Sequence, residues 1–127
     1  MKKYITPQDI RPPFARYSHG VEVSADARLV FCSGQLGIAA DGSVPETTEE
    51  QARLCFANVE AVLREAGMGL EDIVRINGYG AGGEPRRPAV AVRDGLLGDP
   101  LPASTLMIVS GFADPRFTVE IECIAAR

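Results

Sequence analysis

The sequence contains no long uninterrupted run of apolar residues, and this absence excludes one class of protein. A helix that crosses a membrane needs about 18–20 consecutive apolar residues, and no stretch of the 127 residues approaches that length. Residues 1–10 carry two lysines with no apolar segment behind them, so we expect no signal peptide. We therefore expect no membrane partner.

Cysteine is scarce and scattered. The three cysteines, Cys32, Cys55 and Cys123, lie far apart, and no two of them form a Cys-x-x-Cys pair. Isolated thiols in apolar surroundings are typical of small core residues in a reducing compartment, and they argue against a disulfide framework or a zinc site. We therefore expect a cytoplasmic protein.

Histidine and clustered basic residues are also scarce. His19 is the only histidine, and one histidine without a nucleophile motif nearby defines neither a catalytic triad nor a metal site; we interpret it as a loop residue. The net charge is −4, and the basic clusters at 2–3 and 86–87 are short. A nucleic-acid partner would require a basic stripe and a high pI, so we expect none.

What is present is the composition of an ordinary globular domain, with 46% hydrophobic and 24% charged residues. The length suits a single core, because domains cluster near ~100–150 residues. With no internal repeat and no linker, residues 1–127 are predicted to form one domain.

The clearest element is a helix predicted over residues 47–66. Thr47 and Glu50 fit a capping box, as do Thr48 and Gln51, and Gly67 suits the left-handed position after a helix. Apolar residues recur between these ends at helical spacing: Ala52, Phe56, Val59, Leu63 and Ala66.

Weaker patterns predict the rest of the fold, while residues 1–20 read as mostly loop and extended chain. Strands are expected at 21–24, 29–33, 71–79, 104–110 and 117–125, and a second helix at 88–97. The resulting order ββαβαββ predicts an α+β fold, with one mixed sheet and both helices packed on one face. Val30 and Cys32 face opposite to Leu29 and Phe31, so both faces of the sheet are partly apolar. The face without helices would meet a partner, and we expect a homo-oligomer.

Two glutamates lie in the last predicted strand. Strand alternation places Glu120 and Glu122 on the face opposite Val119, Ile121 and Cys123. A carboxylate that faces a cleft from a rigid strand is well placed to move a proton or activate a water molecule. The spacing alone favours the simpler interpretation, two solvated side chains on an exposed sheet face.

Gly78, Gly80 and Gly83 satisfy the dinucleotide-binding pattern G-x-G-x-x-G. The pattern should follow the first strand of a βαβ array, whereas here only one short helix and two strands remain after it. We therefore interpret the segment as a flexible loop.

Several short blocks together carry a resemblance to a known family. They are Tyr-Ser-His-Gly-Val at 17–21, Ser-Gly-Gln at 33–35, Asn-Val-Glu-Ala-Val-Leu at 58–63, Ala-Gly at 66–67, Asp-Ile-Val at 72–74, Pro-Ala at 102–103 and Val-Glu-Ile-Glu-Cys-Ile-Ala at 119–125. No single block is specific, but their order and spacing resemble the RidA family, also called YjgF or L-PSP, over nearly the whole chain.

The resemblance implies a chorismate-mutase-like fold that assembles as a homotrimer, with the sheets forming a central barrel and a cleft between each pair of subunits. Better-known members are enamine and imine deaminases, hydrolases that convert reactive products of PLP enzymes to 2-oxo acids and ammonia. By similarity, Tyr17, Ser33 and Gly34 would line the cleft, and Glu120 would position or activate the attacking water. An iminium carbon is already electrophilic, so this small-molecule chemistry requires neither metal nor cofactor.

The chain departs from the family pattern at Ser104, where the resemblance predicts the arginine of Pro-Ala-Arg. That arginine would hold the substrate carboxylate by two charge-assisted hydrogen bonds, each worth roughly 1.5–3 kcal/mol. Serine has no charge and a shorter reach.

Three interpretations stay open. Arg93, Arg16 or another arginine could enter the cleft as a substrate-binding replacement; the cleft could hydrolyse a substrate without that carboxylate; or the trimer could only bind a small metabolite. Some relatives have also been called translation-inhibiting ribonucleases. An acidic chain without a histidine pair or a basic groove does not favour that activity.

Overall fold

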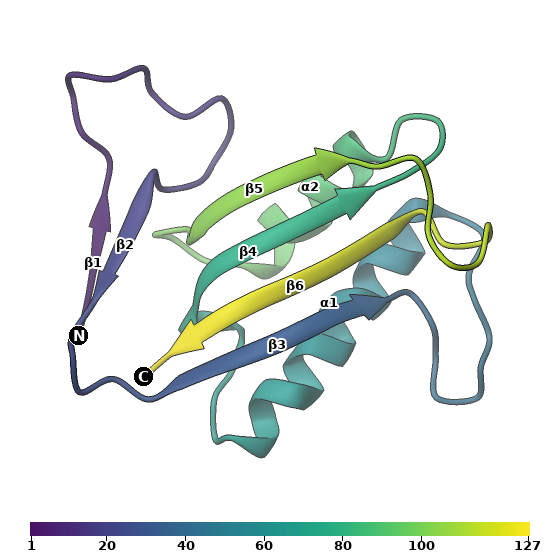
Figure 1. The fold of residues 1–127 in the computed structure, drawn as a ribbon, viewed down its shortest axis with the longest axis horizontal. Coiled ribbons are helices and arrows are strands. Elements are labelled where there is room, and N and C mark those ends of the chain that lie inside the picture. Colours follow the sequence, from purple (N-terminus) through teal and green to yellow (C-terminus); the bar gives the residue numbers. More distant parts are fainter.

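A four-stranded mixed sheet with two helices on one face forms the body of the protein (Figure 1). The computed structural model describes residues 1–127. Its elements are β1 (Lys2–Ile5), β2 (Gly20–Val23), β3 (Leu29–Leu36), α1 (Thr48–Glu65), a 3-10 turn (Leu70–Asp72), β4 (Ile73–Gly80), α2 (Arg86–Leu96), β5 (Ala103–Ile108) and β6 (Val119–Ala126). The predicted α+β class is confirmed.

The large sheet has the strand order β3-β6-β4-β5, and a separate β1-β2 ribbon lies to one side of it. β6 pairs antiparallel with both β3 and β4, whereas β4 and β5 are parallel because α2 crosses over between them. β3 and β5 are therefore the two edges of the sheet, a separation that matters for the site.

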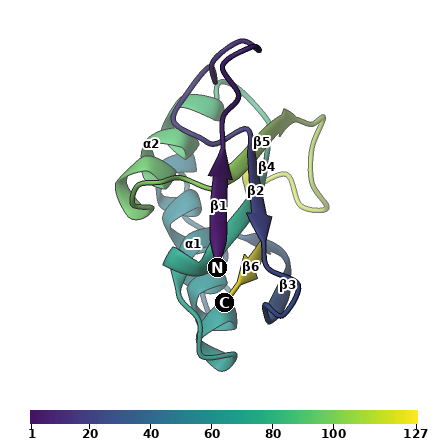
Figure 2. The same ribbon diagram turned by 90° about the vertical axis from the view of Figure 1, so that its left-hand side faces the viewer.

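Helix α1 forms because its end signals and its apolar stripe agree. The Thr47 hydroxyl accepts a hydrogen bond from the Glu50 N–H at 3.1 Å, and Gly67 takes the left-handed conformation with φ +71°. The helix lies against β3 and β6, and the second helix covers the same face of the sheet (Figure 2). The helix predicted over 47–66 is confirmed.

The core lies between the helices and the sheet. Phe56, Val59 and Leu63 of α1 are almost completely buried, as are Val119 and Ile121 of β6. Each such side chain stabilises the fold by roughly 1.5–3 kcal/mol relative to leaving it exposed. Neither helix combines the length and the apolar character that crossing a membrane would require.

Several elements differ from the predictions, by up to two residues at the ends of β4, β5 and β6 and by more elsewhere. Residues Lys2–Ile5 form the short strand β1 against β2, a pairing that local patterns could not show. α2 begins at Arg86 instead of 88, because proline is tolerated in the first turn of a helix and Pro88 therefore does not mark its start. β3 continues past Gly34 to Leu36 through a register shift between Cys32 and Gln35.

The glycine segment after β4 forms a turn built for close packing. Gly80 ends the strand, and a Cβ there would lie 2.7 Å from a ring carbon of Pro85. Gly82 and Gly83 take positive φ values of +73° and +43°. Steric demands at the turn between β4 and α2 thus account for these three glycines.

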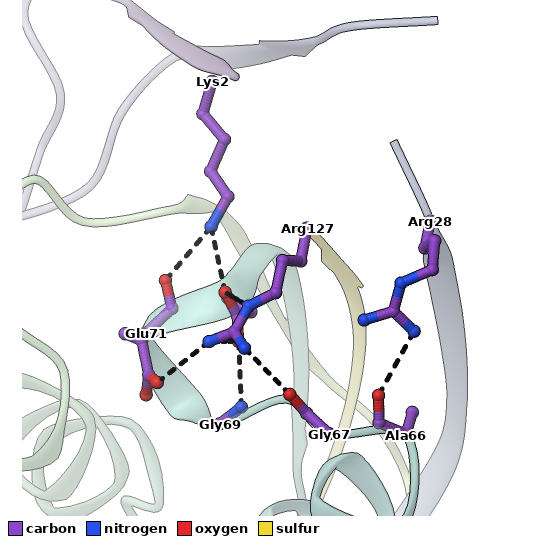
Figure 3. A network of polar contacts seen from close by, with 8 residues as sticks. Lys2, Arg28, Ala66, Gly67, Gly69, Glu71 and Arg127 are labelled. Carbon is purple, nitrogen blue, oxygen red and sulfur yellow. Dashed lines mark hydrogen bonds and ion pairs between the residues drawn. The ribbon is translucent and has the colours of Figure 1, made fainter. Parts of the chain in front are cut away.

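Both ends of the chain are joined to the turn before β4 (Figure 3). Asp72 is only 4% exposed, and its carboxylate accepts the Gly69 N–H at 2.9 Å and lies 3.1 Å from the Arg127 guanidinium and 3.5 Å from Lys2 Nζ. Burial by itself would raise the pKa of Asp72, but Gly69, Arg127 and Lys2 outweigh it and hold that pKa below its usual value.

Candidate functional site

The two glutamates of β6 lie on the face of the sheet away from the helices. Glu120 is paired in register with Tyr79 of β4 and Leu36 of β3, while Glu122 is opposite Asn77. The alternating burial of β6 confirms that both carboxylates point away from the core. Their surroundings nevertheless differ.

Glu122 is committed to neighbouring side chains. Its carboxylate accepts hydrogen bonds from the Tyr79 hydroxyl at 2.6 Å and from the Asn77 amide at 3.1 Å. The bond to Glu122 favours the protonated phenol and raises the pKa of Tyr79. Asn77 in turn accepts from Arg75 at 2.9 Å. Glu122 therefore belongs to a polar network that holds the open face together, and it is not simply solvated.

Glu120 has no such partner. It is half-buried, and no other residue donates a hydrogen bond to its carboxylate or forms an ion pair with it. Every fully buried side-chain nitrogen and oxygen of the chain has a hydrogen-bond partner, so the Glu120 oxygens must be reachable by solvent or ligand. Of the two glutamates, Glu120 is therefore the one whose carboxylate oxygens accept no hydrogen bond from another residue of the chain.

The irregularity in β3 places Ser33 and Gly34 opposite Glu122 and brings Gly34 against the side chain of Glu120. Two residues of β3 face one residue of β6 at this point, which is the geometry of a β-bulge. A Cβ on Gly34 would lie only 2.5 Å from Glu120 Oε2, so the missing side chain leaves the room that the carboxylate occupies. The structure thus brings two of the predicted site residues together, Gly34 and Glu120, whereas Ser33 lines a hollow with Asn77 and Glu122.

The other predicted residues surround a groove of about 480 Å³ along the edge strand β5. Tyr17 reaches it from the N-terminal loop, Arg93 from α2 and Ser104 from β5. Sequence reasoning missed the other six lining residues, among them Phe14 and Arg86. The only signal for Arg86 was its place in a short basic pair, which by itself points to no site.

Arg93 does reach Ser104, as the first interpretation of the missing arginine requires. It is 8% exposed and donates to the Ser104 hydroxyl at 3.0 Å, to the Arg16 carbonyl at 3.1 Å and to Asp94 at 3.0 and 2.9 Å. Its guanidinium therefore ties α2 to β5 and to the N-terminal loop. The side chain of Arg16 is exposed and paired with Asp99 at 2.7 Å.

One chain keeps the two groups of site residues apart. Ser104 is in register with Ile76, whose side chain is buried beneath the helices, whereas Glu120 is in register with Tyr79 on the open face. The two strands are separated by β4, which places their axes roughly 10 Å apart. Tyr17, Arg93 and Ser104 thus lie at one edge, and Glu120 points from the opposite face.

His19 contributes to the N-terminal loop. Its Nε2 lies 2.8 Å from the carbonyl oxygen of Arg11, and its ring stands edge-on to that of Tyr17 at 6.0 Å. No group of three histidine, cysteine, aspartate or glutamate side chains gathers anywhere in the chain in a way that could hold a metal ion. The functional groups available for chemistry in the two groups of site residues are therefore a carboxylate, hydroxyls and guanidinium groups.

Comparisons with known proteins agree on one family. The family model described as Endoribonuclease L-PSP matches residues 8–127. Schizosaccharomyces pombe protein mmf2, mitochondrial by its name, is 37% identical over 100 residues, which is 77% of this chain and 79% of that protein. Escherichia coli TdcF, named as a candidate reactive intermediate deaminase, is 34% identical over 77 residues, 60% of this chain and 57% of that one.

Solved structures give the same answer over the full length. The Rid-family protein YyfB of Yersinia pestis matches with a TM-score of 0.82 and 27% identity, covering 99% of this chain and 98% of that one. E. coli TdcF with bound serine matches with a TM-score of 0.72 and 25% identity, covering 98% of both chains. The chain belongs to the RidA family, also called YjgF or L-PSP.

Proposed function

We propose that this protein hydrolyses a reactive enamine or imine to a carbonyl compound and ammonia, with Glu120 as the residue that handles the proton. The observation that carries the proposal is the contrast on β6: Glu122 is held by Tyr79 and Asn77, whereas Glu120 has no partner in the chain. A carboxylate of this kind can accept a proton from water. The resemblance of TdcF, a candidate deaminase by name, supports the reaction class.

The proposed reaction needs one base and one water molecule. The water oxygen forms a bond to the iminium carbon while Glu120 accepts one of its protons. The carboxyl then returns that proton to the nitrogen of the carbinolamine. The C–N bond breaks as the hydroxyl proton passes to the Glu120 carboxylate and the carbonyl forms, and the departing ammonia takes up that proton and leaves as ammonium. The carboxylate is regenerated, so neither metal nor cofactor enters the cycle.

We further propose that the site is completed by a second copy of the chain in a homotrimer. Within one chain, Glu120 and Ser104 point from opposite faces of the sheet. The open face also carries large apolar side chains, with Phe31 71% and Met107 55% exposed. A sheet face of this kind is suited to an interface between subunits. We place this activity in the cytoplasm, on the basis of three unpaired cysteines.

The proposal is tested by following oxo-acid release from imines made in situ, either by a PLP lyase acting on serine or by an amino-acid oxidase. The protein should accelerate the release over the spontaneous rate, and Glu120→Gln should lower kcat by about 10²–10⁴-fold. Glu122→Gln is the matched control from the same strand and face, since glutamine still accepts the Tyr79 hydroxyl, and its kcat should stay within a few fold. A wild type that gives no acceleration would leave a trimer that only binds a metabolite.

A further inference from the structure

The residues that line the groove along β5 include positively charged side chains and no negatively charged ones. The N-terminal loop, α2 and β5 supply nine lining residues, and these include two arginines and no acidic residue. The cations are Arg86 and Arg93. A groove lined by cations alone favours an anionic ligand.

Only one of the two arginines is free to bind such a ligand. Arg93 is buried, its charge is balanced by Asp94, and its donors are directed to Asp94, Ser104 and the Arg16 carbonyl. Arg86 is exposed and makes no ion pair or side-chain hydrogen bond with any residue of the chain. A free guanidinium can take a carboxylate by two parallel hydrogen bonds.

The contact with Arg93 also orients Ser104. The serine oxygen accepts a hydrogen bond from Arg93 Nη1 at 3.0 Å. The serine O–H then remains as a donor that can turn toward the groove. Arg93 in this view is a positioning residue, while Ser104 and Arg86 supply the donors.

The remaining walls of the groove are mostly apolar. Val90 and Leu106 line it, together with the ring of Phe14, which is 74% exposed. That ring is held without burial, because the Arg11 guanidinium lies 4.2 Å from its centroid and the Phe14 N–H donates to the Tyr17 hydroxyl at 3.3 Å. A volume of about 480 Å³ has room for more than a methyl group.

We propose that Arg86, assisted by the Ser104 hydroxyl, binds the carboxylate of imines derived from amino acids with bulky apolar side chains, whose side chain would lie against Phe14, Val90 and Leu106. This assignment rests on the proposed function for the reaction, but the binding of the carboxylate can be measured without it. Arg86 would then replace, from a different element, the arginine that the resemblance predicts at position 104.

The binding experiment uses the assembled protein and stable 2-oxo acids, which carry the same carboxylate and side chain as the imines. By calorimetry, 4-methyl-2-oxopentanoate should bind more tightly than pyruvate, and Arg86→Gln should weaken its binding about tenfold or more. Arg87→Gln is the matched control, because Arg87 is the exposed neighbour of Arg86 and has the same charge but does not line the groove. It should bind as the wild type does.

Each other outcome overturns the inference. Equal binding by Arg86→Gln and the wild type would show that Arg86 does not hold the carboxylate, and equal losses in both variants would show only a general charge effect. No binding of either oxo acid to the wild type would also contradict it.

A hydrolysis assay separates this inference from the proposed function. Imines of leucine and alanine, generated by an amino-acid oxidase, should be hydrolysed with a higher kcat/KM for leucine, and Arg86→Gln should lower that kcat/KM by the same factor as it weakens binding. Binding that depends on Arg86 without any acceleration of hydrolysis would refute the deaminase activity and leave the carboxylate site standing. Acceleration that Arg86→Gln leaves unchanged would refute the carboxylate site alone.

Discussion

At the scale of single residues, two glutamates of the same strand and face have been given different roles by their neighbours. Alternation along the sequence placed Glu120 and Glu122 on one face, which the structure confirms. It could not show which of them is hydrogen-bonded to neighbouring side chains, because Tyr79 and Asn77 are 43 and 45 residues away from Glu122 in the chain. Long-range hydrogen bonds of this kind leave no local pattern.

The space around Glu120 gives a test at the same scale. In Gly34→Ala, the new Cβ would lie 2.5 Å from Glu120 Oε2, so the carboxylate must move. Because it is the far end of a flexible side chain, we expect the melting temperature to change by only a few degrees, while kcat falls by at least tenfold. Thermal unfolding and the hydrolysis assay check both parts. Unchanged activity would mean that the present position of the carboxylate does not matter.

At the scale of elements, the sequence patterns predicted correctly the features that depend on residues close together in the chain. The helix at 47–66 was found because its capping residues and apolar stripe lie within it. The strand β1 and the bulge at Ser33 and Gly34 were missed, since both depend on pairing with a distant strand. The sequence left open whether Arg93, Arg16 or another arginine enters the cleft, and it could not predict the contact between Arg93 and Ser104, because that contact depends on how α2 lies over β5.

The turn before β4 provides a test of stability. Asp72→Asn keeps the shape but removes the charge that Arg127 and Lys2 contact, and it should lower the free energy of unfolding by about 1.5–3 kcal/mol. Glu71→Gln is the control, because its side chain is exposed and its ion pair with Arg127 should contribute less than about 1 kcal/mol. Urea unfolding measures both.

The effect of Asp72 should also depend on pH in a defined direction. The folded state lowers the pKa of this carboxyl from its ordinary value of 3.8, so its contribution is present above that pH. The contribution is lost as the pH falls below 3.8 toward the pKa in the folded state, and the wild type and Asp72→Asn should there become more alike in stability. A difference that stayed constant down to strongly acidic pH would contradict an electrostatic role.

At the scale of the whole molecule, the sequence resemblance predicted the family and the fold, and both are confirmed. The structure adds that a single chain separates the predicted site residues, with Glu120 on the open face and Ser104 beneath α2. The chain therefore needs a partner if these residues are to act on one substrate. Assembly is the claim on which the proposed chemistry depends most.

Subunit complementation tests that claim most directly. Glu120→Gln and Tyr17→Ala should each be inactive alone, because each removes one half of every site. Chains of the two variants, co-expressed in equal amounts and purified as mixed oligomers, should form some sites with one intact half from each, and random mixing predicts about a quarter of wild-type activity. Mixed oligomers as inactive as the two parents would show that both residues act within one chain, or not at all, and would contradict the account.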